Sequence, residues 1–253
     1  MRRENEGMYR ERDSTAADGV VWTGAAENGE PHRVVPDGCM DLVWDGSRVL
    51  VAGPDTAAHF SDWEPGQVFV GLRLSPGAGP AVVGVPADEL RDLRVPLEDV
   101  WASGEARRLG EQAGLAADPG VSLERAAARR TAAGTGGDPA MRQAAALLAA
   151  GASAADVAEE TGLGPRRLHR RSTAAFGYGP RTLGRILRFD RALAAARAGT
   201  PFAEVAAATG YADQAHLARE VKALAGDPLS VLVGHSSGAN NSIQWPSGSH
   251  TTA

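Results

Sequence analysis

The chain has 253 residues, of which 43% are hydrophobic and 23% are charged, and its formal net charge is −5. This composition fits one or two globular domains and excludes collagen-like, coiled-coil and fully disordered chains. A single cysteine, Cys39, excludes an internal disulfide, and no apolar run is long enough to span a membrane. Residues 1–13 are charged, unlike an export signal, so we expect a soluble, cytoplasmic protein.

The charge is distributed unevenly along the chain. Residues 1–138 hold 14 Arg and 23 acidic residues, a balance of −9, whereas residues 139–234 hold 12 basic and 8 acidic residues, a balance of +4. Within 164–197 there are nine Arg and one acidic residue, Asp190. A cluster with so few acidic neighbours is unlike an ordinary solvated helix face, and it indicates a polyanionic partner.

We expect residues 1–19 to be a leader and the following segment to be rich in β-strands. Short apolar runs separated by Gly, Pro and Asp are typical of strands, and they occur at 20–23, 40–44, 48–52 and 67–74. Asp45-Gly46 lies between two of these runs and predicts a tight hairpin turn. The predicted strands belong to a sensor or dimerisation domain over residues 20–133.

The end of this domain has helical patterns. They cover 79–85, 97–102, 105–117 and 122–131. Gly134-Thr135-Gly136-Gly137 predicts a linker over 134–137, and the small, polar residues 235–253 predict a disordered tail.

After the linker, residues 138–234 show regular helix starts and an internal repeat. Asp138-Pro139 predicts an N-cap followed by Pro at the first helical position, and Ser153 with Asp156 forms a variant capping box. An offset of 48 residues aligns two stretches without gaps, and the identical pairs are Gly151/Gly199, Val157/Val205, Ala158/Ala206, Thr161/Thr209 and Gly162/Gly210.

Each copy of the repeat predicts a helix, a Thr-Gly turn and a second helix. The first copy is 154–176 and the second is 202–225. Gly162 and Gly210 allow the positive φ angle that turns the second helix across the first. Two such helix-turn-helix units joined by a basic helix are a much more specific signal than one.

These motifs resemble the AraC family of bacterial transcription regulators. The resemblance covers about residues 139–234 and is most specific at Glu204-Val205-Ala206 followed by Thr209-Gly210-Tyr211 and Asp213-Gln214, with His216-Leu217 after them. It implies a seven-helix domain whose two units, bridged by a long helix, read successive major grooves. Together with the N-terminal half, the expected fold class is α+β: a β-rich sensor-like domain with trailing helices, then an all-α domain.

The outward faces of the second helices supply candidate DNA contacts. Arginine makes bidentate bonds to guanine and glutamine to adenine, and other arginines bind phosphates. The predicted base-reading residues are Arg166, His169, Arg170, Gln214, Ala215, His216 and Arg219. The predicted phosphate contacts are Arg167, Arg171, Arg181, Arg185 and Arg188.

Four positions depart from the family pattern, two in each unit. A serine-like cap is usual where this chain has Gly164 and Ala212, and Phe is usual at Ser172 and Val221. Since a hydroxyl at Ser172 replaces a core aromatic ring, we expect Phe176 or Leu168 to fill the space.

In the N-terminal domain, Trp44, Phe60 and Trp63 are candidates for an effector pocket, with plain core packing as the alternative. Asp37, Asp41 and Asp55 lie beside Gly and Pro and suggest turn or capping carboxylates. The spacings of His32, Cys39 and His59 match no metal motif, and no catalytic or nucleotide-binding motif is present. We expect no metal and no cofactor.

The sequence thus predicts a non-enzymatic transcription regulator that binds double-stranded DNA and whose N-terminal domain senses a signal. A small-molecule effector, a second copy of the chain and RNA polymerase are its candidate partners. The alternative is an enzyme-like or thiol-reactive N-terminal domain that the DNA-binding half directs to DNA. An exposed Cys39 with a perturbed pKa, lying in a pocket, would favour this alternative.

Overall fold

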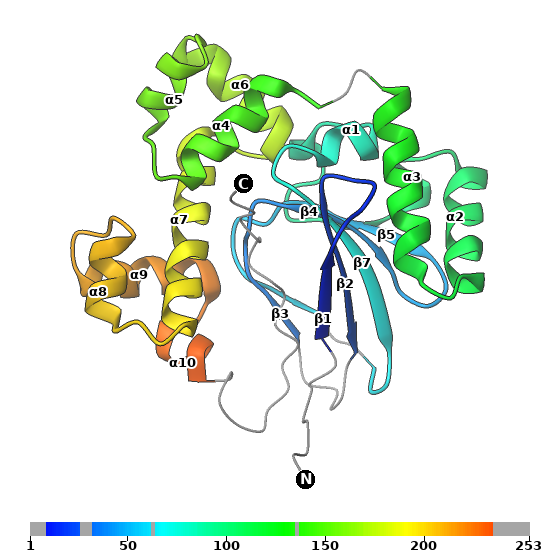
Figure 1. The fold of residues 1–253 in the computed structure, drawn as a ribbon, viewed down its shortest axis with the longest axis horizontal. Coiled ribbons are helices and arrows are strands. Elements are labelled where there is room, and N and C mark those ends of the chain that lie inside the picture. Colours follow the sequence, from blue (N-terminus) through cyan, green and yellow to red (C-terminus); the bar gives the residue numbers. More distant parts are fainter. Residues whose placement is uncertain (1–8, 26–31, 62–63, 135–136, 235–253) are drawn as a thin grey trace.

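A computed structural model describes residues 9–25, 32–61, 64–134 and 137–234. Figure 1 shows a sheet with helices beside it, formed by the N-terminal part of the chain, and a second group of helices formed by the C-terminal part. The predicted tail, 235–253, lies outside the described residues. None of the described helices is long and apolar enough to cross a membrane.

The N-terminal part is built on a six-stranded antiparallel sheet. Its strand order is β1-β2-β7-β4-β5-β8, and a second, two-stranded sheet pairs β3 with β6. The strands are β1 (Tyr9–Asp13), β2 (Gly19–Ala25), β3 (His32–Val34), β4 (Met40–Trp44), β5 (Val49–Ala52), β6 (His59–Ser61), β7 (Val68–Leu74) and β8 (Arg94–Pro96). All four predicted strands are present, as β2, β4, β5 and β7.

The predicted hairpin between β4 and β5 is confirmed. Gly46 has a φ of 102°, and the Asp45 carboxylate accepts hydrogen bonds from the backbone N–H groups of Ser47 and Arg48, both at 2.9 Å. The turn fixes the register in which Leu42 and Val51, both fully buried, lie opposite each other.

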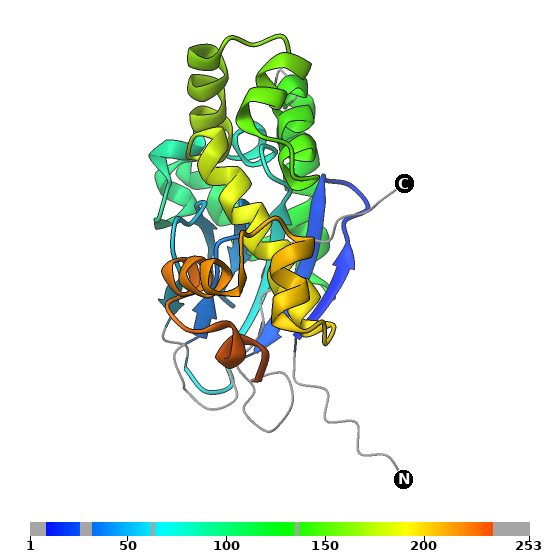
Figure 2. The same cartoon turned by 90° about the vertical axis from the view of Figure 1, so that its left-hand side faces the viewer.

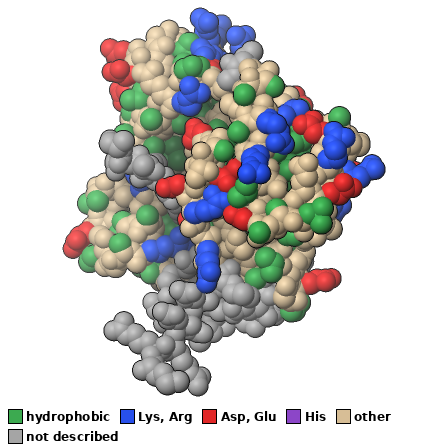
Figure 3. Space-filling view, turned by 45° about the vertical axis from the view of Figure 1, so that its right-hand side comes forward, with side chains coloured by type: hydrophobic (Ala, Val, Ile, Leu, Met, Phe, Trp, Pro, Cys, Tyr) green, Lys and Arg blue, Asp and Glu red, His purple; other side chains and the backbone are tan. Residues whose placement is uncertain are grey.

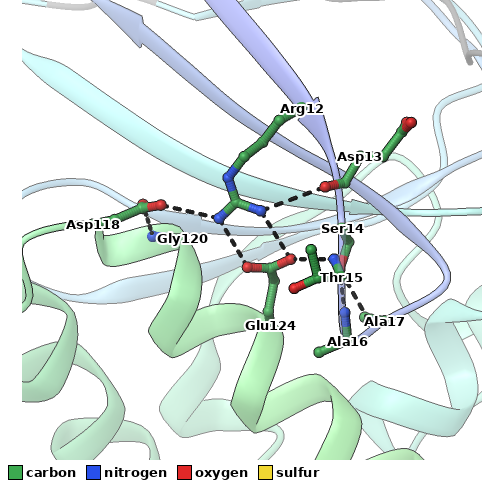
Figure 4. Close-up of polar contacts among 9 residues, drawn as sticks. All are labelled: Arg12, Asp13, Ser14, Thr15, Ala16, Ala17, Asp118, Gly120 and Glu124. Atoms are coloured by element: carbon green, nitrogen blue, oxygen red, sulfur yellow. Dashed lines mark hydrogen bonds and ion pairs between the residues drawn. The ribbon is translucent and has the colours of Figure 1, made fainter.

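Strand β1 corrects the prediction of a leader up to residue 19. Figure 4 shows how Arg12 fastens this strand to helix α3 (Pro119–Ala133): its guanidinium binds Glu124 at 2.8 and 3.0 Å and Asp118 at 3.0 Å. The buried Glu124 also accepts the N–H of Thr15 at 2.8 Å. An Arg-Glu-Arg-Asp strand lacks the apolar alternation that predicts strands, but this ion-pair cluster and pairing with β2 hold it in place.

Helices cover one side of the sheet. Their buried side chains form one core with those of β2, β4, β5 and β7. The helical elements here are α1 (Gly79–Val83), η1 (Ala87–Glu89), η2 (Leu97–Asp99), α2 (Ser103–Leu115) and α3. The helix predicted over 97–102 is only the single 3₁₀ turn η2, which follows Pro96 and ends at Asp99.

Seven helices make up the described C-terminal part, as the sequence predicted. They are α4 (Pro139–Ala149), α5 (Ala154–Glu160), α6 (Pro165–Phe176), α7 (Pro180–Arg197), α8 (Phe202–Ala208), α9 (Gln214–Ala225) and α10 (Leu229–Gly234). Figure 2 shows α7 running between an upper group, α4 to α6, and a lower group, α8 to α10. Its 18 residues span about 27 Å at 1.5 Å per residue.

Candidate nucleic-acid interface

The first helix-turn-helix unit consists of α5 and α6. The predicted capping box is present, since the Ser153 hydroxyl accepts the Asp156 N–H at 3.2 Å and the Asp156 carboxylate accepts the Ser153 N–H at 2.8 Å. At the other end of α5, the Thr161 hydroxyl donates to the Val157 carbonyl at 2.6 Å. Gly162 then takes a φ of 64° and turns the chain toward α6.

The second unit, α8 and α9, repeats this geometry 48 residues later. The Thr209 hydroxyl donates to the Val205 carbonyl at 2.6 Å, and Gly210 has a φ of 79°. The duplication inferred from the sequence is therefore also a structural repeat. One detail differs from the prediction: α9 is capped by Asp213, whose carboxylate accepts the His216 N–H at 2.6 Å, and not by residue 212.

On α6 the inward and outward faces lie as expected. Leu168 and Phe176 are buried, and Arg166, His169 and Arg170 are exposed. The His169 ring lies over the next turn, where a Cβ on Gly179 would come within 2.8 Å of it. Arg166 and Arg170 therefore have free access to a ligand, whereas His169 is positioned against the start of α7.

Ser172 is fully buried on α6, and its space is filled from another helix. Its hydroxyl lies 3.8 Å from the sulfur of Met141 on α4, which is also buried. Phe176 packs toward the N-terminal part, where a Cβ on Gly77 would lie 2.9 Å from its ring. The expectation that Phe176 or Leu168 compensates for the missing aromatic ring thus overlooked Met141, a flexible side chain suited to irregular gaps.

On α9, three of the four predicted base-reading residues are exposed: Gln214, Ala215 and Arg219. His216 differs. Its Nδ1 accepts the Ala212 N–H at 3.3 Å, and its ring stands edge-on to Tyr211 with the centroids 5.3 Å apart. His216 therefore stabilises the start of α9, and this use of its ring competes with the predicted contact to a base.

The five arginines predicted to bind phosphate fall into two groups. Arg167 and Arg181 are exposed and form no ion pair among the described residues. Arg171 instead binds the Asp138 carboxylate, Arg185 binds Glu220 at 2.5 Å, and Arg188 lies 4.5 Å above the Tyr211 ring. These three arginines thus contact other elements of the protein, and their predicted contacts with phosphate stay a prediction.

Two grooves border α7. One has a volume of about 720 Å³ and runs between the α4–α5 connection and the Thr209-Gly210 turn, and four arginines of α7 line it: Arg181, Arg185, Arg188 and Arg191. The other, of about 510 Å³, lies between α5, α6 and the start of α7 and shares Arg181 with the first. By contrast, acidic and basic side chains lie next to each other over the side of the N-terminal part seen in Figure 3.

The N-terminal part contains a buried charged cluster that the sequence analysis missed. Arg73 is 3% exposed and lies 3.1 Å from Asp37, Asp41 accepts the Trp22 indole N–H at 2.7 Å, and Asp55 pairs with Arg94 at 2.5 Å. Burial raises the pKa of all three carboxyl groups against the opposing charges of Arg73 and Arg94. A charged residue inside the apolar strand 68–74 was the available signal, because a buried charge needs a partner.

This cluster lines two cavities. One, of about 90 Å³, lies within the N-terminal part, and the other, of about 320 Å³, extends to Arg142 on α4 and Asp190 on α7. Neither is lined by Trp44 or Phe60. Trp44 is half-buried, Phe60 is 51% exposed with the Arg33 guanidinium 5.1 Å above its ring, and Trp63 lies outside the described residues.

Cys39 borders both cavities but is itself 5% exposed. Burial and the neighbouring Asp37 raise its pKa well above the ordinary value for a thiol. It therefore stays protonated at neutral pH, which makes it a weak nucleophile. The described residues hold no group of three or more His, Cys, Asp or Glu side chains placed to bind a metal.

Comparison with known proteins places the two parts in different families. Residues 157–233 match a family model described as a helix-turn-helix domain, and residues 19–96 match one described as a domain of unknown function, DUF6597. None of the curated proteins compared with the chain matches it.

Three similar solved structures are of ToxT from Vibrio cholerae. An apo single-residue variant from strain SCE256 is 13% identical with a TM-score of 0.49, covering 89% of this chain and 99% of that one. ToxT of strain O395 is 10% identical with a TM-score of 0.46, covering 92% of this chain and 99% of that one. Wild-type ToxT bound to an unsaturated fatty acid is 11% identical with a TM-score of 0.43, covering 92% of this chain and 97% of that one. Identities this low leave the function to be argued from this chain's own residues.

The helix-turn-helix match takes in both copies of the repeat, from Val157 in α5 to the end of α9 and into α10. The exposed arginines on α6 and the exposed polar residues on α9 lie where such domains carry their DNA contacts. The C-terminal part of the chain is thus a helix-turn-helix domain of the AraC type, and the chain is a DNA-binding transcription regulator.

Proposed function

We propose that the chain binds one face of duplex DNA with α6 and α9 in two successive major grooves. The observation that carries this proposal is the repeat itself: two units with the same turns, joined by one helix about 27 Å long. Successive turns of a major groove are about 34 Å apart, which is reachable by helices that extend beyond the ends of α7.

In this proposal Arg166, Arg170, Gln214 and Arg219 contact bases, and Arg167 and Arg181 contact phosphates. Arg171, Arg185 and Arg188 position helices. Apart from strand β1, which belongs to the N-terminal domain, the domain division remains as inferred from the sequence, with residues 134–137 as the linker. The N-terminal domain senses a small molecule without catalysing a reaction. The net negative charge of residues 1–138 supports assigning DNA binding to the C-terminal domain, because a negatively charged domain repels the phosphate backbone.

The test is DNA binding by the full chain as a function of salt. We expect the logarithm of the binding constant to fall linearly with the logarithm of salt concentration, with a slope of several units, because each arginine bound to a phosphate releases counterions. Selection from random duplexes followed by footprinting should reveal two half-sites about one helical turn apart. A slope near zero, or protection of a single groove, would contradict the proposal.

The thiol-reactive alternative has a specific test of its own. A buried, protonated Cys39 should react with a maleimide or alkylating reagent far more slowly in the folded protein than in denaturant. Rapid modification of the native protein at pH 7 would favour that alternative.

A further inference from the structure

One loop of the N-terminal part contacts the ends of both recognition helices. The loop is residues 53–58, between β5 and β6. At Gly177, which ends α6 with a φ of 84°, an added Cβ would lie 2.5 Å from the Pro54 ring. In the same loop the Ala58 N–H donates to the Leu224 carbonyl, in the last turn of α9, at 2.7 Å.

Next to the Gly177 contact and next to the Leu224 hydrogen bond, the N-terminal part makes a further contact. Arg91 donates to the Gly177 carbonyl at 3.1 Å, beside the packing of η1 against α6. Arg33 forms an ion pair with Asp227, just after α9. The N-terminal part therefore holds the C-terminal ends of α6 and α9 through polar bonds to backbone and side chain.

The loop is itself fixed to the N-terminal part. Asp55 forms two hydrogen bonds with Arg94, at 2.8 and 2.5 Å. The N–H and hydroxyl of Thr56 both donate to the Asp92 carboxylate, at 2.7 and 3.0 Å, and the Asp92 N–H donates to the Pro54 carbonyl at 3.1 Å. Such a dense set of bonds leaves the loop little freedom to move relative to the sheet.

Asp92 adds a sign of constraint. Its φ of 60° makes it the one residue other than glycine with a positive φ among those the structure describes. Such a conformation is unfavourable for a residue that has a side chain, and it persists only where neighbouring contacts demand it. Here it directs the Asp92 carboxylate to Thr56 and its N–H to Pro54.

We infer that loop 53–58 is a specificity-determining element: it fixes the distance between α6 and α9, and thereby the number of base pairs between the two half-sites. This inference rests on the proposed function. If α7 were the sole connection between the two units, bending of this helix would let them adapt to different distances between the half-sites. The loop adds a second connection and so restrains the distance between α6 and α9. Inserting one base pair moves a half-site by about 3.4 Å along the DNA axis, more than two units held at two places can accommodate.

The experiment measures how the full chain discriminates between half-site spacings. The probes are duplexes carrying the selected half-sites with the optimal spacer and with one base pair removed or added. The main variant, Arg33→Gln with Arg91→Gln, removes the two contacts that arginine side chains make to the helix ends. Both side chains are at least partly exposed, and neither belongs to the proposed DNA interface. A second variant, Asp92→Gly, removes the carboxylate that accepts both bonds from Thr56 and suits the positive φ of this position.

A matched control separates the effect of losing two positive charges from the effect of losing the contacts to the helix ends. Arg125→Gln with Arg129→Gln makes the same charge change on exposed residues of α3. We expect wild type and this control to prefer the optimal spacer by about tenfold or more, since misplacing one specific contact costs about 1–3 kcal/mol. Both test variants should reduce that preference to about threefold or less, with base preferences inside each half-site unchanged.

The outcomes are distinguishable. If either folded test variant, judged by circular dichroism and melting temperature, keeps the wild-type spacing preference, the inference is wrong. A uniform loss of affinity at every spacing also overturns it. If the wild-type chain binds a single half-site or no DNA, the proposed function fails instead, and the spacing inference fails with it.

Discussion

Arg171 on α6 donates two hydrogen bonds to the carboxylate of Asp138, the residue that caps α4. Asp138 also accepts the N–H groups of Ala140 and Met141, so one carboxylate links the helix that follows the linker to the first recognition helix. Burial alone would raise the pKa of Asp138, but Arg171 and these N–H groups outweigh it and lower the pKa.

This pair predicts a pH dependence of stability. Because the pKa of Asp138 is lower in the folded state, its contribution is present above the unfolded value of about 3.9 and is lost as pH falls through the lower, folded value. Asp138→Asn keeps a capping oxygen but loses the charge that pairs with Arg171, so it should reduce the free energy of unfolding at pH 7 by about 0.5–1 kcal/mol. Urea unfolding of wild type and variant at pH 7 and at pH 3 measures this difference in the free energy of unfolding. A difference between variant and wild type that is equally large at both pH values would contradict the assignment.

Base reading and phosphate binding should separate in competition experiments. Arg170→Ala and Gln214→Ala should each relax the preference at particular base pairs and cost about 1–3 kcal/mol on the best site. Arg181→Ala should weaken all sequences equally and reduce the salt slope by about one. Arg185→Ala should reduce the slope by less, because Glu220 already compensates its charge. If Arg170→Ala left the ranking of operator variants unchanged, α6 would not read bases through this residue.

The two turn glycines should respond alike to substitution. Gly162 and Gly210 have open space where a Cβ would be added but φ values of 64° and 79°, so Gly162→Ala and Gly210→Ala should each destabilise by about 1 kcal/mol. Gly164, with equally open space and a φ of −59°, is the control, and Gly164→Ala should change stability little. Chemical denaturation of the three single variants and the Gly162/Gly210 double variant tests this. Equal losses at all three positions would show that backbone conformation is not the cause.

The ion pairs of β1 should contribute to stability as well. Arg12→Ala leaves the buried Glu124 carboxylate without its guanidinium and should cost about 1–3 kcal/mol. The double variant Arg12→Ala with Glu124→Gln should recover part of this loss, since the uncompensated charge is gone. Arg107→Ala, at an exposed position of α2, serves as the control. A double variant less stable than Arg12→Ala would contradict the role assigned to Glu124.

Much of the C-terminal part was predictable because its signals are local. Asp138-Pro139, the Ser153 capping box and the Thr-Gly turns each fix a helix end within four residues of sequence. The matching hydroxyl bonds of Thr161 and Thr209 show why the 48-residue repeat survives as a structural repeat. The positions of strands β2, β4, β5 and β7 followed from apolar runs in the same way.

What the sequence did not reveal depends on residues far apart in the chain. Arg12 meets Glu124 across 112 positions, and Arg185 meets Glu220 across 35. Helical spacing places Arg185 on an outward stripe, but it cannot tell whether an acidic residue of another helix already occupies that stripe. The sequence did not reveal the two cavities for a related reason: aromatic residues suggested where a pocket lies, whereas buried arginine–carboxylate pairs line both cavities. The predicted effector pocket stays a prediction.

The strand order has a consequence for how copies of the chain could associate. The six-stranded sheet ends at β1 on one side and β8 on the other. Four of the five residues of β1 are charged, and β8 has three residues including Pro96, which lacks an N–H. Charged and proline-containing edges resist pairing with a strand of another molecule. We therefore expect a homodimer, where one forms, to use a surface other than these two edges, and the protein to resist aggregation through its sheet.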